Sequence, residues 1–387
     1  MNLVTSTLPE ESEYPNASGL FLQRNKQLSF IGSLFFNNMP ELSFLDLSDT
    51  RIRILPCSLF RLPKFNVLLL RNCACMPEIP AKIGNLANLE VLDLGMKQYL
   101  IHVQMCRLVC LRHTKLSMYG TESEHSYVNL MSEEMVPDGI LSEFKELECL
   151  SITVHINDMC WRKNAACIVK DLVNLESLSF LQFYFPRVAR FQAFIRAKNS
   201  RTNGILRSFK SIVGFNVSRF INIVPSEVAS LFDESMNCLR FVKVKDTPEK
   251  IKNVLAHAAI FYLDTHTDVE RLSEFDYSNF RPIKLCLQLW VYSLSKLEYI
   301  CEPLPLESPS TPPSCGSFWS LKSLTVSRCG GLKFILLESM FCELKSLEEL
   351  VVECCAYVET TVKQDTTKKV IKKALCQLRK VELAYLT

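Results

Sequence analysis

The sequence predicts an α/β solenoid, in which successive coils each contribute one short strand to a parallel sheet. The first observation is a pattern of leucines, L-x-x-L-x-L or a close variant, which occurs three times within Pro40–Gly95. The second is its period, because the central leucines, Leu45, Leu68 and Leu92, are 23 and 24 residues apart. The third is that related patterns continue to the end of the chain. A period in the twenties with this inner spacing is the leucine-rich-repeat signature.

Each coil separates core positions from surface positions, because alternate residues of a strand point to opposite faces. Leu45 and Leu47 are expected to face the interior, while Phe44, Asp46 and Ser48 face outward. A second apolar row closes each coil behind its strand. We therefore expect a curved leucine-rich-repeat horseshoe with a concave parallel β-sheet and an irregular or short-helical convex side.

The repeats are expected to begin after an N-terminal tail, residues 1–16, and to fill residues 17–387 as a single domain. The core triplets expected after the three clear coils are Leu111, Thr114 and Leu116; Leu147, Leu150 and Ile152; Leu175, Leu178 and Phe180; Leu239, Val242 and Val244; Cys286, Leu289 and Val291; Leu321, Leu324 and Val326; Leu347, Leu350 and Val352; and Leu378, Val381 and Leu383. A weaker strand is expected at Phe209 and Ile212, another at Phe261 and Leu263, and a helix over residues 187–200. This gives about a dozen repeats, with insertions near residues 119–141, 183–205 and 301–317.

Composition limits the function classes. A hydrophobic fraction of 48% excludes a disordered chain, and a net charge of +3 gives no general attraction to nucleic acid or anionic membrane. The first residues lack a basic segment followed by an apolar one, so no signal peptide is expected. No apolar run reaches the roughly 20 residues of a membrane span. Seventeen cysteines in such a chain predict reduced thiols and a cytoplasmic location.

Several of these cysteines have a structural interpretation. Asn25, Cys73, Cys329 and Cys355 come just after their strands, where a small polar or thiol side chain bonds backbone groups inside the turn. His102, Cys106, Cys110 and His113 have a spacing that a zinc site could use, but the segment runs into an expected strand, which favours repeat packing.

No group of residues predicts catalysis. The six histidines are scattered, and none of the eleven glycines begins a G-x-x-x-x-G-K-[ST] phosphate loop. We expect no enzyme activity, no cofactor and no metal.

Two surfaces are candidates for binding a protein partner. The concave-face candidates are Phe44, Asp46, Ser48, Arg71, Asp93, Lys115, Lys243, Gln288, Trp290 and Tyr292. The second surface is a basic patch within residues 177–226, a span with eight basic residues and no acidic ones, and it consists of Arg187, Arg190, Arg196, Lys198 and Arg201. Such a patch could dock an acidic partner, although a plain solvated face is the alternative and nucleic acid is disfavoured.

The sequence resembles a known family in LSFLDLSDTRIRILP and LANLEVLDLG, and again in LKSLTVSRCGGLKFI and LEELVVECCAYVE. These segments are similar to the leucine-rich-repeat region of plant nucleotide-binding disease-resistance proteins, and the resemblance covers roughly Gly19–Leu386. It implies recognition of a pathogen effector or a guarded host protein, or regulation of a nucleotide-binding module. Because the phosphate loop is missing, nucleotide binding is not implied for this chain.

Two other functions remain open. One is a stand-alone intracellular scaffold of the Ras-suppressor-like repeat class, which the regular coils of residues 40–95 would suit and the irregular later coils would not. The other is a substrate receptor of a ubiquitin ligase, which requires an F-box-like helical segment before the repeats. Residues 1–19 are too short for that segment.

Overall fold

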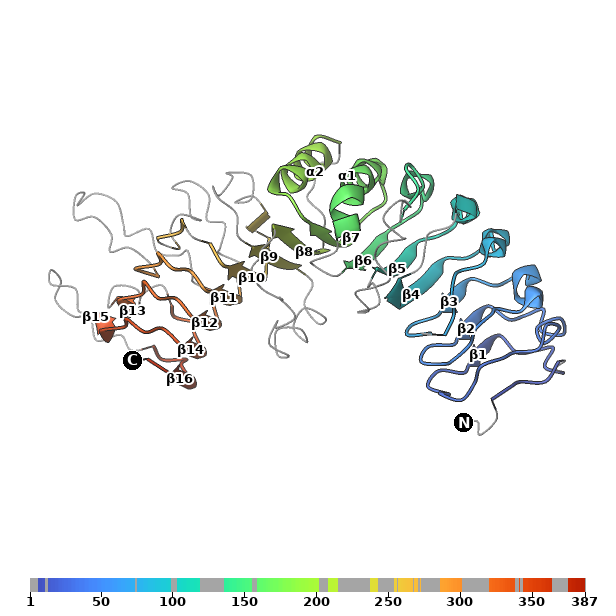
Figure 1. Cartoon of the computed structure of the whole chain (residues 1–387), viewed down its shortest axis with the longest axis horizontal. Coiled ribbons are helices and arrows are strands. Elements are labelled where there is room, and N and C mark those ends of the chain that lie inside the picture. Colours follow the sequence, from blue (N-terminus) through green and yellow to red (C-terminus); the bar gives the residue numbers. More distant parts are fainter. Residues whose placement is uncertain are drawn as a thin grey trace. The chain divides into compact units, whose positions relative to one another are not determined.

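The structure, a computed structural model shown in Figure 1, describes most of the chain. The described residues are 6–10, 13–73, 75–98, 103–118, 136–154, 159–201, 208–214, 237–242, 254–255, 257–266, 268–270, 272, 286–300, 320–337, 341, 344–363 and 375–386. The chain divides into two compact units, one with residues 1–184 and 196–208 and the other with residues 185–195 and 209–387. Each unit is described by itself.

In the first unit, parallel strands follow one another in chain order along one side, and short helical segments follow the other side (Figure 1). The strands are β1 (Gly19–Phe21), β2 (Phe44–Asp46), β3 (Val67–Leu69), β4 (Val91–Gln98), β5 (His113–Met118), β6 (Cys149–Val154) and β7 (Phe180–Phe185), the last residue of which lies in the second unit. The helical segments are the 3₁₀ helices Cys57–Arg61, Ala81–Asn85, Val103–Arg107 and Leu141–Glu143, followed by the helix α1 (Met159–Asn174).

The second unit continues the same design. Its parallel strands are β8 (Ser208–Gly214), the first residue of which lies in the first unit, β9 (Asn237–Val242), β10 (Ile260–Asp264), β11 (Gln288–Tyr292), β12 (Ser323–Ser327), β14 (Glu349–Glu353) and β16 (Lys380–Ala384). Two further strands, β13 (Phe334–Leu337) and β15 (Thr360–Lys363), pair in parallel as a separate ladder. The unit boundary falls inside the helix α2 (Val188–Arg201), which confirms the helix expected over residues 187–200.

The leucine register confirms the predicted solenoid. Leu45 pairs with Leu68, and Leu68 with Leu92, so the central leucines of three coils stack in one row. All three are fully buried, as is Leu47. In the second unit Leu289 and Leu324 are aligned in the same way. The leucines therefore form a continuous interior in each unit, which no single coil could bury alone.

A backbone turn of one kind follows many strands. It contains a non-glycine residue with φ between 53° and 63°, and these residues are Arg24, Asp49, Asn72, Thr265, Ser293, Arg328, Cys354 and Tyr385. This conformation is costly for residues with a side chain. It is compensated by a hydrogen bond to the next coil: the Asp49 amide donates to the Arg71 carbonyl at 2.8 Å, and Arg328 to Glu353 at 2.9 Å.

The residue after this turn satisfies backbone carbonyls inside the coil. Asn25 Nδ2 donates to the Leu22 carbonyl at 2.8 Å, and Cys73 Sγ donates to the Leu47 carbonyl of the preceding coil at 3.1 Å. His266 Nε2 lies 3.1 Å from the Phe241 carbonyl. These contacts confirm the structural interpretation of Asn25 and Cys73.

The buried thiols are consistent with this role. Burial raises the pKa of the Cys73 thiol, and burial raises that of Cys286 to about 12. Cys329 and Cys355 are buried at the corresponding turns, where their thiols lie 3.5 and 3.4 Å from the carbonyls of Ser327 and Glu353. The thiols of Cys73, Cys286 and Cys329 are thus held in their neutral form and act as small apolar side chains, whereas the hydrogen bond from Cys329 lowers the pKa of Cys355 to about 7.

Two strands lie three residues away from their expected places. In β7, Leu181 pairs with Leu150, so the core triplet is Leu178, Leu181 and Phe183 rather than Leu175, Leu178 and Phe180. In β9, Leu239 pairs with Phe261, so Leu239 and Phe241 align with the leucine row, whereas Val242, although fully buried, aligns with Asp264 in the outward register. Each segment carries apolar residues in two frames three residues apart, and packing against the neighbouring strand selects one frame.

The described part of the chain contains no group of three or more His, Cys, Asp or Glu side chains that could hold a metal ion. His102 of the zinc candidate lies outside the described residues, as do most of the intervals 119–141 and 301–317. The interval 183–205 contains the end of β7 and α2. No helix in the described ranges is long and apolar enough to cross a bilayer.

Replacing Leu47 with aspartate should prevent folding. Leu47 is fully buried, so the change removes about 2 kcal/mol of apolar burial and places a charge in the core, for a total loss of at least about 3 kcal/mol. Ile54→Asp is the matched control, because Ile54 is 69% exposed and a surface change there should cost about 0.5 kcal/mol or less. Thermal unfolding followed by circular dichroism measures both. An unchanged Leu47→Asp melting curve would contradict the register.

Replacing Ser293 with valine should destabilise the second unit by about 1 kcal/mol or more, because a β-branched residue tolerates φ of 56° poorly. Ser293→Asn should change stability by about 0.5 kcal/mol or less, since asparagine adopts this conformation readily. Chemical denaturation of both variants tests the turn. Equal effects would mean that the positive φ is not a determinant of stability.

Candidate functional site: the strand face

The strand face is the set of outward positions on the parallel strands, and in the first unit it has a line of three apolar residues beside a line that contains charged ones. Phe44, Val67 and Val91 are paired across β2, β3 and β4 and are each partly exposed. In the next row, Asp46 pairs with Leu69. Strand pairing therefore brings residues more than 20 positions apart in the chain side by side on one surface.

Ion pairing fixes the charged row near β4. Arg71 Nε donates to Asp93 Oδ2 at 2.8 Å, and the Gly95 amide donates to Asp93 Oδ1 at 3.0 Å. A Cβ at Gly95 would lie 3.1 Å from both Arg71 Cγ and Asp93 Oδ1, so glycine leaves room for this pair. Asp93 is only 6% exposed because Arg71 lies against it, whereas the Arg71 side chain is 53% exposed.

The remaining candidates of the first unit differ in exposure. Lys115 pairs with Asp93 across the β4–β5 ladder and is partly exposed. Ser48 occupies an outward position but is only 8% exposed, and its amide donates to Asp46 Oδ1 at 2.9 Å. Ser48 therefore contributes to positioning Asp46 more than to the accessible surface.

In the second unit the strand face is aromatic. The rings of Tyr262 and Trp290 are stacked, with centroids 6.4 Å apart and an interplanar angle of 19°. The guanidinium of Arg328 lies 5.8 Å from the centre of the Tyr292 ring. Within the described residues, Trp290 Nε1 and Gln288 Oε1 are buried without a hydrogen-bond partner. These two atoms are the polar groups of Gln288 and Trp290 that β11 leaves unsatisfied within the described residues.

A buried ion pair lies on the same face and was not predicted. Arg240 donates from its guanidinium to Asp264 Oδ2 at 2.8 Å, and each side chain is 3% exposed. The guanidinium also lies 4.7 Å from the centre of the Tyr262 ring. The three-residue offset at β9 hid Arg240, because the expected frame placed Lys243 outward instead. Lys243 lies outside the described residues.

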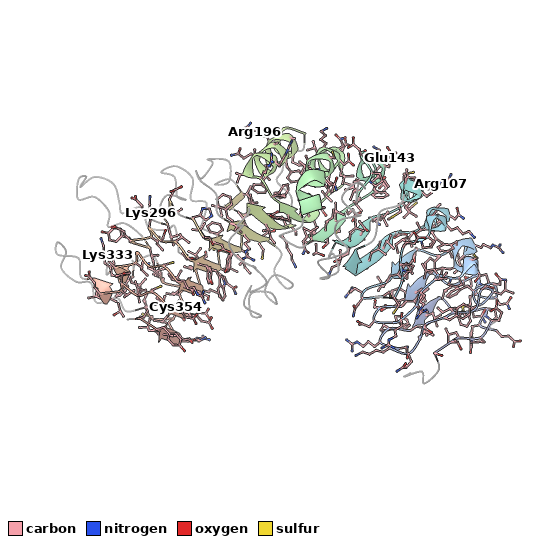
Figure 2. The ribbon with its side chains drawn as sticks, in the orientation of Figure 1. Arg107, Glu143, Arg196, Lys296, Lys333 and Cys354 are labelled. Carbon is pink, nitrogen blue, oxygen red and sulfur yellow. The ribbon has the colours of Figure 1, made fainter. Side chains whose placement is uncertain are left out.

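The basic patch is only partly formed as expected. Arg187, Arg190 and Arg196 are exposed, and Figure 2 shows Arg196 on α2. Lys198 is a correction: it is 4% exposed, and its ammonium donates to the Leu175 carbonyl, so it is part of the interior. Arg190 and Arg196 are six residues apart on α2, which places them about 120° apart around its axis. The side chain of Arg201 lies outside the described residues.

Replacing Asp264 with asparagine should destabilise the second unit by about 3–5 kcal/mol, because it leaves the buried charge of Arg240 without its partner. The double variant Arg240→Met with Asp264→Leu should be much closer to the unmodified chain, since both charges are removed together. Denaturant titrations of the single and double variants measure the difference. Equal losses in the two variants would contradict the assignment of a buried pair.

Comparisons with known proteins agree with this architecture. Residues 306–387 match the family model described as plant disease resistance protein RPS2-like, leucine-rich repeats. A disease resistance protein of Arabidopsis thaliana is 32% identical over 157 residues, which are 40% of this chain and only 15% of that protein. The chain thus matches a small part of the length of this relative.

Two solved structures match most of the length of this chain at low sequence identity. An internalin of Listeria monocytogenes covers 95% of this chain and 87% of its own, with 11% identity and a TM-score of 0.47. A leucine-rich-repeat protein of Leptospira interrogans covers 92% and 90%, with 14% identity and a TM-score of 0.45. The strand ladder is that of a leucine-rich-repeat fold, and the sequence matches make part of this chain similar to the leucine-rich repeats of plant disease resistance proteins.

Proposed function

We propose that this chain is a non-enzymatic, protein-binding repeat domain of plant innate immunity that acts in the cytoplasm. It recognises a pathogen effector or a guarded host protein, regulates a nucleotide-binding module, or does both. The similarity to plant disease resistance proteins supports this role. Because the match spans 15% of the relative, the activities of the whole relative are not assigned to this chain.

The proposal rests on the construction of the strand face. Its side chains are held by a ladder of backbone hydrogen bonds, while the alternate side chains of the same strands form the leucine core. An outward residue can therefore change without disturbing the core, since the two sets face opposite sides. A rigid surface whose residues vary independently of the fold suits a domain that must recognise proteins of diverse sequence.

The composition of this face fits a protein ligand. Partly exposed Trp290 and Tyr292 in the second unit, and Arg71 in the first, are residue types that contribute most to protein interfaces. Large aromatic side chains bury much area with few rotatable bonds, which limits the entropy lost on binding.

Chemical reactivity is not part of this proposal. The raised pKa values of Cys73 and Cys286 keep these thiols protonated near neutral pH, and a protonated thiol is a poor nucleophile. The chain can position side chains against a partner, and this requires no proton or group transfer.

Site-specific photocross-linking should locate the working surface. A benzophenone amino acid placed at Lys115 on the strand face should yield saturable cross-links to plant proteins in a leaf extract, competed by the unmodified chain. The same group at Arg107 is the matched control, because Arg107 is exposed in the same coil on the helical side and the substitution removes the same charge (Figure 2). Equal cross-linking at both positions, or none at Lys115, would contradict the proposal.

A further inference from the structure

The first unit contains a contiguous apolar surface at its strand face. Phe44, Val67 and Val91 lie in register across three paired strands, and Leu69 lies beside them one register position along. Phe21 on β1 extends this surface, since it is 65% exposed and its ring centroid lies 4.7 Å from that of Phe44. These five residues are here called the apolar row. Contiguous exposed apolar side chains of this kind mark interaction surfaces.

Asp46 is set into this surface as a single carboxylate. It lies between Phe21 and Leu69 in the strand register and is partly exposed. Its Oδ1 accepts the Ser48 amide at 2.9 Å, which fixes the orientation of the carboxylate. Among the described residues, Asp46 has no ion-pair partner, whereas the neighbouring Asp93 is neutralised by Arg71.

We propose that the apolar row and Asp46 bind an amphipathic helix of a partner protein, with a lysine or arginine of that helix paired to Asp46. This rests on the proposed function and adds the chemistry of the partner at one part of the strand face. When the partner helix packs on the apolar row, it would exclude water around Asp46. The hydrogen bond between Asp46 and the lysine or arginine of that helix would then be stronger than in water.

The spacing of the apolar row favours a helix over an extended peptide. Phe21 lies one register row away from Phe44, Val67 and Val91, but measured across strands about 4.8 Å apart the four side chains from β1 to β4 span about 14 Å in three steps. A helix advances about 5.4 Å per turn and offers one apolar side chain per turn, a mismatch of about 2 Å over the row. An extended chain places side chains of one face about 6.7 Å apart, a mismatch of about 6 Å.

Charge selectivity for a model helix tests this. The probe is a peptide of about 15 residues with leucines three and four residues apart and one lysine beside them. Its counterpart has glutamate in place of the lysine. Calorimetry with the full chain should show the lysine peptide binding on the order of tenfold more tightly than the glutamate peptide.

Asp46→Asn should remove this preference, while the asparagine oxygen can still accept the Ser48 amide. Glu143→Gln is the control, because Glu143 is exposed on the helical side and that variant should keep the full preference (Figure 2). Val67→Asn should weaken the binding of both peptides by the same factor, because it interrupts the apolar row. Thermal unfolding verifies that each variant is folded.

Several results would overturn this inference. The first is equal affinity of the chain for the lysine and glutamate peptides. The second is that a lysine peptide in which prolines prevent helix formation binds as tightly as the original lysine peptide. The third is that the chain forms a dimer that Val67→Asn dissociates. If these occur while cross-linking at Lys115 remains specific, the partner chemistry is wrong and the proposed function stands. If the Lys115 cross-links are also missing, the proposed function fails as well.

Discussion

The structure depends on one constraint, which is that the backbone of each coil must form hydrogen bonds with the backbone of the next coil. Strands of three to eight residues cannot be stable alone, and each gains its stability from the neighbours on both sides. The positive-φ turn extends this ladder beyond the strand, because the amide of a residue such as Asn72 reaches the carbonyl of Gly95 in the next coil at 2.8 Å. Strain at the turn is thus compensated by one further bond between coils.

The two units use this ladder to present different chemistry. In the first unit the strand face combines an apolar row with a single fixed carboxylate at Asp46. In the second unit aromatic rings and a buried ion pair lie at comparable positions, and Tyr262 contacts both Arg240 and Trp290. Both surfaces are built on the same leucine core, which shows how far the outward residues can vary while the coil is preserved.

The sequence predicts the parts of this fold that follow from the period of the leucine pattern. Where leucine occupies both strand positions, as at Leu45 and Leu47, the strand, its register and its buried face follow directly. Prediction is wrong where other apolar residues offer a second frame, as at Leu239 and Val242, because only contact with the neighbouring strand selects between them. The helix α1 was also missed, although Trp161, Ala165 and Ile168 are spaced for one helical face.

The candidate site was less predictable than the fold. Alternation along a strand assigns Asp46 and Asp93 to the outward side. It does not reveal that Arg71 neutralises Asp93 while Asp46 has no ion-pair partner among the described residues. Nor does a run of basic residues indicate that Lys198 turns inward to a carbonyl. These outcomes depend on which side chains of different coils meet, and that information is distributed over segments more than 20 residues apart.

The small ladder formed by β13 and β15 has a mechanical consequence for the coils that carry it. Phe334 pairs with Thr360 there, while Leu324 pairs with Leu350 between β12 and β14 of the same two coils. Both edges of these coils are therefore held at the strand spacing of about 4.8 Å. Because the two coils are held at the same spacing by both strand pairs, they cannot tilt apart at either edge. We therefore expect this pair of coils to be a stiff, flat segment.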